Sequence, residues 1–81
     1  LVPAVDVKII SVDATAGAFQ AMLDGTLNVT VECNPLLAPQ VYEAALAALN
    51  GETLPKWIPS QESVFYMVDP NLKDIAAGRK Y

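Results

Sequence analysis

A single carboxylate stands in this sequence where a ligand-binding acid would be placed. Asp13 follows a β-branched run at residues 7–12 and precedes a segment with helical spacing. Such a run is typical of a strand buried on both faces, and ligands of open α/β sheets collect outside the carboxyl ends of the strands. The carboxylate could accept hydrogen bonds from ligand hydroxyl groups, a contribution of about 1.5–3 kcal/mol for a charged acceptor. It could instead cap the following helix, a role worth about 1 kcal/mol.

Two more candidate ligand contacts follow the next predicted strand. Residues 27–33 alternate between apolar and polar, as a half-buried strand does, and Asn34 and Pro35 come next. The Asn34 amide can donate and accept hydrogen bonds, although Asn before Pro is also a good helix N-cap. The Cys33 thiol is a weak hydrogen-bond partner, and no basic residue lies nearby in the sequence to activate it. We therefore expect Asn34 to contribute more to a site than Cys33.

The composition argues against several classes of function. The 81 residues include no His and one Cys, and they carry a net charge of −4. An internal disulfide, a zinc site and a Ser-His or Cys-His catalytic pair are therefore not expected. Nucleic-acid binding is disfavoured because it normally requires a concentrated basic face. We expect a non-catalytic protein with no cofactor, no metal and no nucleic-acid partner.

The elements that position these residues alternate in type along the chain. A strand at residues 7–12 is followed by a helix that ends at Gly25, and the strand at 27–33 by a helix from Pro35 to Gly51. Extended pieces and a short helical turn make up the rest. This order predicts an α/β fold in which helices flank a parallel sheet.

The chain is too short to cover both faces of such a sheet, and it is rich in apolar residues. Apolar residues make up 53% of the sequence, a share suited to the interior of a larger molecule. Two or three strands cannot bury both faces of the strand at 7–12. The first residues also lack the basic and apolar regions of a signal peptide. We expect a fragment of a longer protein, which self-associates through uncovered apolar surface when it is isolated.

Four motifs carry a resemblance to a known family. They are Ile9–Asp13, Phe19–Gly25, Asn28–Pro35 and Pro55–Ile58, in this order. Together they resemble the C-terminal quarter of type I periplasmic sugar-binding proteins, and among these the ribose- and galactofuranose-type components of bacterial ABC importers. The ending Gly78–Tyr81 resembles a natural C-terminus of that group.

The resemblance implies a two-lobe protein with a monosaccharide in the cleft between the lobes and an ABC permease as its partner. Residues 1–32 would end the C-terminal lobe, and residues 33–57 would form a hinge segment and a helix that packs on the N-terminal lobe. Residues 58–81 would form the third hinge crossing and the tail. The location would be periplasmic, or extracellular and lipid-anchored in a Gram-positive bacterium.

The family also suggests roles for the candidate residues. An Asp at the position of Asp13 accepts hydrogen bonds from sugar hydroxyl groups in these proteins. They often place an amide two residues before the proline, where this chain has Cys33, so that role passes more naturally to Asn34. Glu32 is expected to be solvated, and Trp57 to pack at the hinge or between lobes rather than against sugar.

Two other functions compete with sugar transport. The effector-sensing domain of a LacI-type regulator shares the fold, and an upstream helix-turn-helix would identify it. A small flavodoxin-like enzyme or receiver could use Asp13 as a nucleophile or metal ligand. An enzyme or receiver of this kind requires a second acid beside Asp13, whereas Asp6 and Asp24 are expected at the opposite edge of the sheet.

Overall fold

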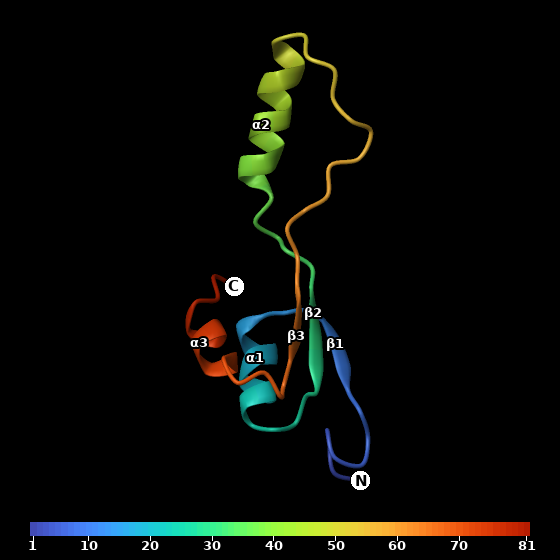
Figure 1. The fold of residues 1–81 in the computed structure, drawn as a ribbon, viewed down its shortest axis with the longest axis vertical. Coiled ribbons are helices and arrows are strands. Elements are labelled where there is room, and N and C mark those ends of the chain that lie inside the picture. The colour runs from blue at the N-terminus through green and yellow to red at the C-terminus, as the bar shows by residue number, and fades with distance from the viewer.

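The computed structural model describes all residues, 1–81, as an elongated molecule with two parts. Its extents are 57 × 23 × 18 Å. The sheet body contains every element except α2, and the α2 arm, residues 33–63, extends from one end of it (Figure 1). The elements in chain order are β1 (Ile10–Asp13), α1 (Ala16–Leu23), β2 (Val29–Glu32), α2 (Ala38–Leu49), β3 (Val64–Tyr66) and α3 (Leu72–Ala77).

The sheet has the order β1-β2-β3. β1 and β2 are parallel, with Ile10 opposite Val29, and α1 makes the crossover between them. The α/β class with helices flanking a mostly parallel sheet is thereby confirmed. β3 differs from the expectation because it runs antiparallel to β2, with Val31 opposite Val64. The reason is the α2 arm, which leaves and re-enters the sheet body at the same end of the strands (Figure 1).

The first helix has the boundaries that its residues predict. Thr15 is its N-cap, and the Ala18 N–H donates to Thr15 Oγ1 at 3.4 Å. Its end is closed by Gly25 at φ +80°, with the Thr26 N–H donating to the Ala21 carbonyl. This is a Schellman ending, for which a glycine with positive φ is suited. Since Thr15 caps the helix, Asp13 does not.

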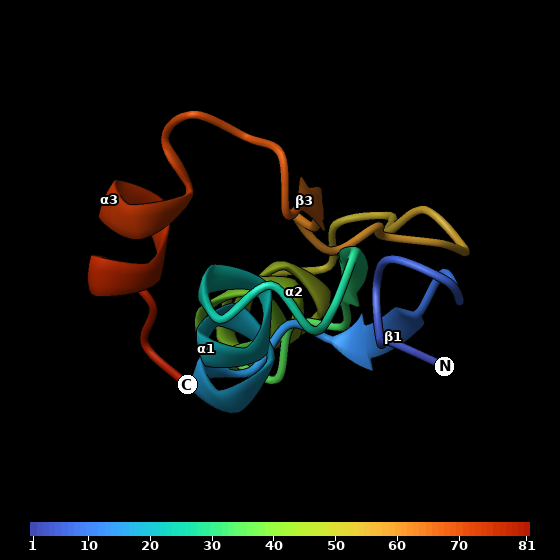
Figure 2. The same ribbon diagram turned by 90° about the horizontal axis from the view of Figure 1, so that it is seen from below.

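The core lies on one side of the sheet. α1 and α3 both cover the same face, as the view along the strands shows (Figure 2). The alternation in β2 places Thr30, rather than Val29 or Val31, fully inside. Its Oγ1 accepts hydrogen bonds from Ser11 Oγ at 2.8 Å and from the Ala14 N–H at 3.2 Å, which satisfies the buried hydroxyl. The buried apolar cluster is Ala14, Phe19, Met22, Leu27 and Leu72.

The opposite face of the sheet is apolar and uncovered. Ile10 and Val12 are 68% and 64% exposed, so β1 is an open edge strand in this chain, whose three strands do not bury both of its faces, as the sequence predicts. Residues paired across the strands share a face, which places six side chains together there. They are Ile10, Val12, Val29, Val31, Val64 and Tyr66.

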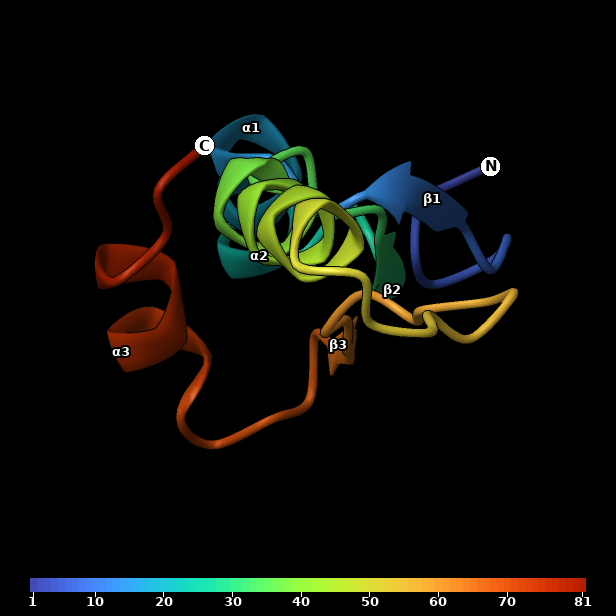
Figure 3. The same ribbon diagram turned by 90° about the horizontal axis from the view of Figure 1, so that it is seen from above.

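The second helix begins later than the sequence predicts. α2 starts at Ala38, and Asn34 forms a local turn in which its Oδ1 accepts from the Leu36 N–H at 2.8 Å. A helix begun at Pro35 would place Pro39 in its interior, where the missing N–H and the ring disfavour it. The helix ends as expected at Gly51, with φ +77°. None of its residues is buried, and seen from above it stands in front of the sheet body, toward the viewer (Figure 3). No helix is long and apolar enough to cross a membrane.

Candidate sugar-binding site

The structure brings the three predicted site residues into one cavity. Asp13 ends β1, and Cys33 and Asn34 follow the end of β2; the two strand ends are adjacent because Asp13 pairs with Glu32 in a parallel ladder. The cavity has a volume of about 530 Å³, within the usual range for small-ligand sites. We call it the strand-end cavity. Its lining is Asp13, Thr15, Cys33, Asn34, Pro35, Leu37 and Tyr81.

Asp13 sits on a strained backbone that turns the chain out of the strand. Its φ is +103° and that of Ala14 is +56°, in a region where residues with a Cβ are uncommon. Such conformations persist where the surroundings enforce them, and they cluster at ligand sites. Here the Ala14 N–H donates to Thr30, and the Ala14 carbonyl accepts from Arg79 Nη2 at 2.9 Å. The exposed Asp13 carboxylate is the only acid that lines the cavity.

Asn34 is held by hydrogen bonds to both of the segments that connect the sheet body with α2. Its N–H donates to Glu62 Oε2 at 2.8 Å, and its Nδ2 donates to the Gln61 carbonyl at 3.4 Å. Its Oδ1 already accepts from Leu36. An amide oxygen has two lone pairs and an amide nitrogen two hydrogens, so one acceptor and one donor position stay available for a ligand.

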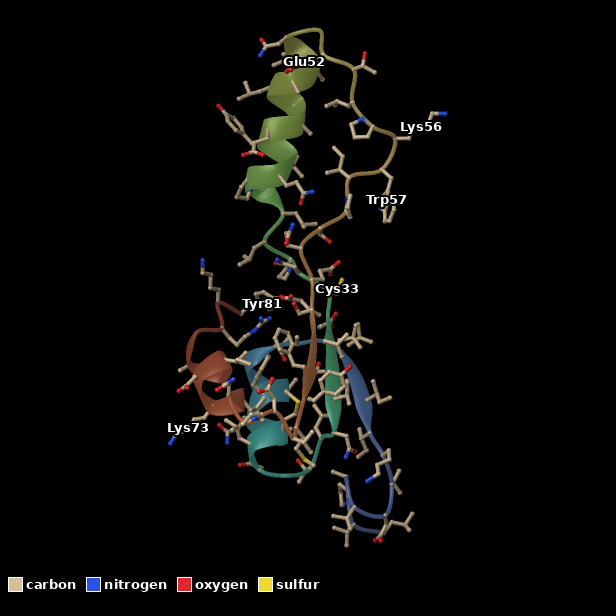
Figure 4. All side chains as sticks on the ribbon, viewed as in Figure 1. Cys33, Glu52, Lys56, Trp57, Lys73 and Tyr81 are labelled. Carbon is tan, nitrogen blue, oxygen red and sulfur yellow. The ribbon has the colours of Figure 1, made fainter.

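Cys33 is an exposed free thiol and the first residue of the α2 arm. Figure 4 shows Cys33 at the junction between the sheet body and the α2 arm, and Tyr81 lies near the same junction. A thiol is a weak hydrogen-bond donor, so this side chain can provide little more than a small apolar wall.

Glu32 is not solvated, contrary to the sequence expectation. Its side chain is 9% exposed, and its Oε2 accepts hydrogen bonds from Arg79 Nη2 at 3.0 Å and from the Tyr81 hydroxyl. Oε1 accepts from the Ser63 N–H at 3.1 Å. These partners, Tyr81 foremost and then Arg79, hold the pKa of the Glu32 carboxyl below its ordinary value. Partial burial and the bond to Glu32 raise the pKa of the Tyr81 hydroxyl.

Arg79 ties the end of the chain to both strand ends. Its guanidinium bonds the Ala14 carbonyl beside Asp13 and the Glu32 carboxylate beside Cys33. It also lies over three aromatic rings, with centroid distances of 5.0 Å for Phe19, 5.0 Å for Phe65 and 4.6 Å for Tyr81. No local sequence pattern reveals this network, because Arg79 is 47 residues from Glu32.

The structure has two cavities besides the strand-end cavity. One, of about 270 Å³, is on the α2 arm between Leu37, Val41 and Ile58, with Trp57 at its edge. Trp57 is 79% exposed and does not line the strand-end cavity (Figure 4). The other, of about 480 Å³, lies beside the tail and shares Asn34 and Tyr81 with the strand-end cavity.

Known proteins with similar sequence or structure include sugar-binding components of transporters. The fructose import binding protein FruE of Bifidobacterium longum (strain NCC 2705) is 37% identical over 59 residues, which are 73% of this chain and 18% of that protein. The periplasmic binding protein of the arabinose ABC transporter from Shewanella sp. ANA-3, bound to α- and β-L-arabinofuranose, superposes with a TM-score of 0.82. It is 33% identical, and the match covers 99% of this chain and 26% of that one.

A third similar structure comes from Mycobacterium smegmatis and is in complex with β-D-fucofuranose. Its TM-score is 0.70 at 36% identity, with 93% of this chain and 26% of that chain covered. No protein-family profile matches. Over most of its length, the chain thus resembles a part of the periplasmic sugar-binding proteins of ABC transporters, as its motifs indicate. It spans about a quarter of the length of these solved structures.

Proposed function

We propose that this chain is part of a longer sugar-binding protein that captures a monosaccharide and delivers it to an ABC permease, without catalysis. The observation that carries the proposal is the convergence of Asp13, Cys33 and Asn34 on one cavity at the carboxyl ends of β1 and β2. Two of the similar structures hold furanose sugars. We therefore propose a five-membered sugar ring as the ligand.

Each residue has a proposed role that its surroundings permit. The Asp13 carboxylate accepts hydrogen bonds from sugar hydroxyl groups, since Thr15 has taken the helix-capping role. The Asn34 amide adds one donor and one acceptor, and Cys33 supplies part of the wall. A single acid in the cavity gives no support to a receiver-type or enzymatic use of Asp13. The similar proteins are transport components, which does not favour a regulator either.

The proposed full-length protein has two lobes joined at the strand-end cavity. Residues 1–32 end one lobe, and residues 33–57 form a hinge segment and a helix that packs on the other. Residues 58–81 form a further hinge crossing and the tail. Support comes from α2, whose exposed apolar side chains include Val41, Leu46 and Leu49. The role implies a periplasmic or other extracytoplasmic location.

The hinge in this proposal consists of two segments held together by side chains. Glu62 accepts from the Asn34 N–H, and Glu32 accepts from the Ser63 N–H, so each segment supplies a carboxylate to the backbone of the other. Lobe closure around a ligand would be stabilised by contacts that the sugar makes on both sides of this hinge.

The test is sugar binding by the full-length protein and by its Asp13→Ala variant, measured calorimetrically. Suitable probes are L-arabinose, D-fructose and D-fucose, each of which has a furanose form. We expect at least one to bind, with an affinity at least tenfold lower in the variant because a charged acceptor is lost, about 1.4 kcal/mol. Asp24→Ala is the matched control, since Asp24 ends α1 and lies outside the cavity. Equal affinities for the wild type and Asp13→Ala would remove Asp13 from the site.

A further inference from the structure

The last residue of the chain forms part of the strand-end cavity. Tyr81 lines it together with Asp13, Thr15 and Asn34, although Tyr81 and Asp13 lie near opposite ends of the sequence. Trp57, the other aromatic candidate for sugar contact, lines a different cavity on the α2 arm. Among the aromatic side chains, only Tyr81 therefore borders the cavity that contains the predicted sugar-binding acid.

The Tyr81 ring is held in place from two directions. Its hydroxyl donates to Glu32 Oε2, and the Arg79 guanidinium lies 4.6 Å from the ring centroid. Arg79 borders the second cavity but not the strand-end cavity, whereas Tyr81 borders both. The ring thus lies where the two cavities meet, and the guanidinium beside it also bonds the Ala14 carbonyl next to Asp13.

These contacts determine which part of the Tyr81 side chain is available to a ligand. The hydroxyl is engaged by Glu32, so the part available in the strand-end cavity is the aromatic carbon surface. A sugar ring has an apolar face of C–H groups, and aromatic carbon is a suitable surface for it. The carboxylate of Asp13 and the amide of Asn34 are suited to its hydroxyl groups.

We propose that Tyr81 is a sugar-contacting residue whose ring packs against the C–H face of the monosaccharide bound at Asp13. The proposal rests on the proposed function, because it assigns a further contact in that same site. Arg79 and Glu32 act through Tyr81 as positioning residues. The preferred ligand is a sugar with a continuous apolar edge, rather than an extended polyol.

The test compares three variants of the full-length protein with the same sugar probes. Tyr81→Leu removes the aromatic surface and should lower affinity at least tenfold. Tyr81→Phe keeps the ring and should bind within about threefold of the wild type, although it loses the bond to Glu32. Tyr66→Leu, an aromatic-to-apolar change on the uncovered face of the sheet, is the matched control and should leave affinity unchanged.

Thermal unfolding of each variant separates a contact from a structural role. If Tyr81 only stabilises the fold, Tyr81→Phe and Tyr81→Leu should both lower the melting temperature, and affinity should be unaffected in whatever protein remains folded. That result would overturn the proposal, as would undiminished affinity in a folded Tyr81→Leu variant. Failure of the wild type to bind any probe would overturn the proposed function together with this contact, which is a distinguishable outcome.

Discussion

Glu32 connects the sequence-distant tail to the end of β2 through one carboxylate. Both of its oxygens accept hydrogen bonds, from Tyr81 and Arg79 on one and from Ser63 on the other. A charged acceptor with such partners is favoured in its ionised form. Glu32 therefore contributes, together with Arg79, to holding Tyr81 at one wall of the strand-end cavity.

The Glu32 network predicts a pH dependence of stability. The pKa of Glu32 is lower in the folded chain than its ordinary value of 4.5. Its contribution is therefore fully present above that value and is lost as the pH falls through the folded-state pKa. We expect Glu32→Gln to destabilise the full-length protein by about 2 kcal/mol at pH 7 and by clearly less at pH 3.5. Urea unfolding at the two pH values measures the difference.

A control isolates Glu32 from the other carboxylates. Glu52→Gln changes an exposed acid at the far tip of the α2 arm and should alter stability little at either pH (Figure 4). An equal loss at pH 7 and pH 3.5 in Glu32→Gln would show that the charge of Glu32 is not what stabilises the fold.

At the residue scale, the sequence patterns predicted which candidate residues lie together at the strand ends, but not the contacts that hold them. Asp13 and Asn34 could be placed because each follows a strand whose pattern is local, and parallel neighbours end at one edge. Arg79 and Tyr81 could not, since their partners are far away in sequence. The expected solvation of Glu32 was wrong for the same reason: its ion pair exists only once the tail folds back.

At the element scale, the spacing of apolar residues and the positions of glycine predicted the strands and the helix ends. They did not predict which face of β2 is buried. Gly25 and Gly51 end their helices as predicted. The alternation in β2 was also correct as a strand signal, yet its fully buried member is Thr30. A hydroxyl can be buried when it is hydrogen-bonded, and Ser11 and Ala14 supply donors that the sequence pattern does not reveal.

This buried hydroxyl leads to a prediction about the sheet body. Thr30→Val has nearly the same shape but leaves the Ala14 N–H and the Ser11 hydroxyl without their acceptor. We expect a loss of about 1–3 kcal/mol in the free energy of unfolding, measured by urea titration. Thr53→Val, at an exposed position after α2, should change it by less than about 0.5 kcal/mol. A neutral Thr30→Val would mean that the bonds at Thr30 contribute nothing to the fold.

At the scale of the whole molecule, the chain buries little of itself. Seven of its 81 residues are buried, so its core is small for an independent domain. One face of the sheet is uncovered, and α2 has no buried residue. Comparison with proteins about four times as long fits this picture, since most of a longer chain would be available to cover these surfaces.

The open sheet face predicts the behaviour of the 81-residue chain expressed alone. Exposed apolar side chains beside an open edge strand favour association between copies, through the face or through strand pairing. We expect dimers or larger species in sedimentation velocity at micromolar concentration. Ile10→Lys with Val12→Lys should shift the chain toward monomer, because both side chains are exposed on that face and lysine blunts edge pairing. Leu1→Lys with Leu23→Lys, two exposed leucines outside the sheet, is the matched control. A wild-type chain that sediments as a monomer would show that the uncovered face does not drive association.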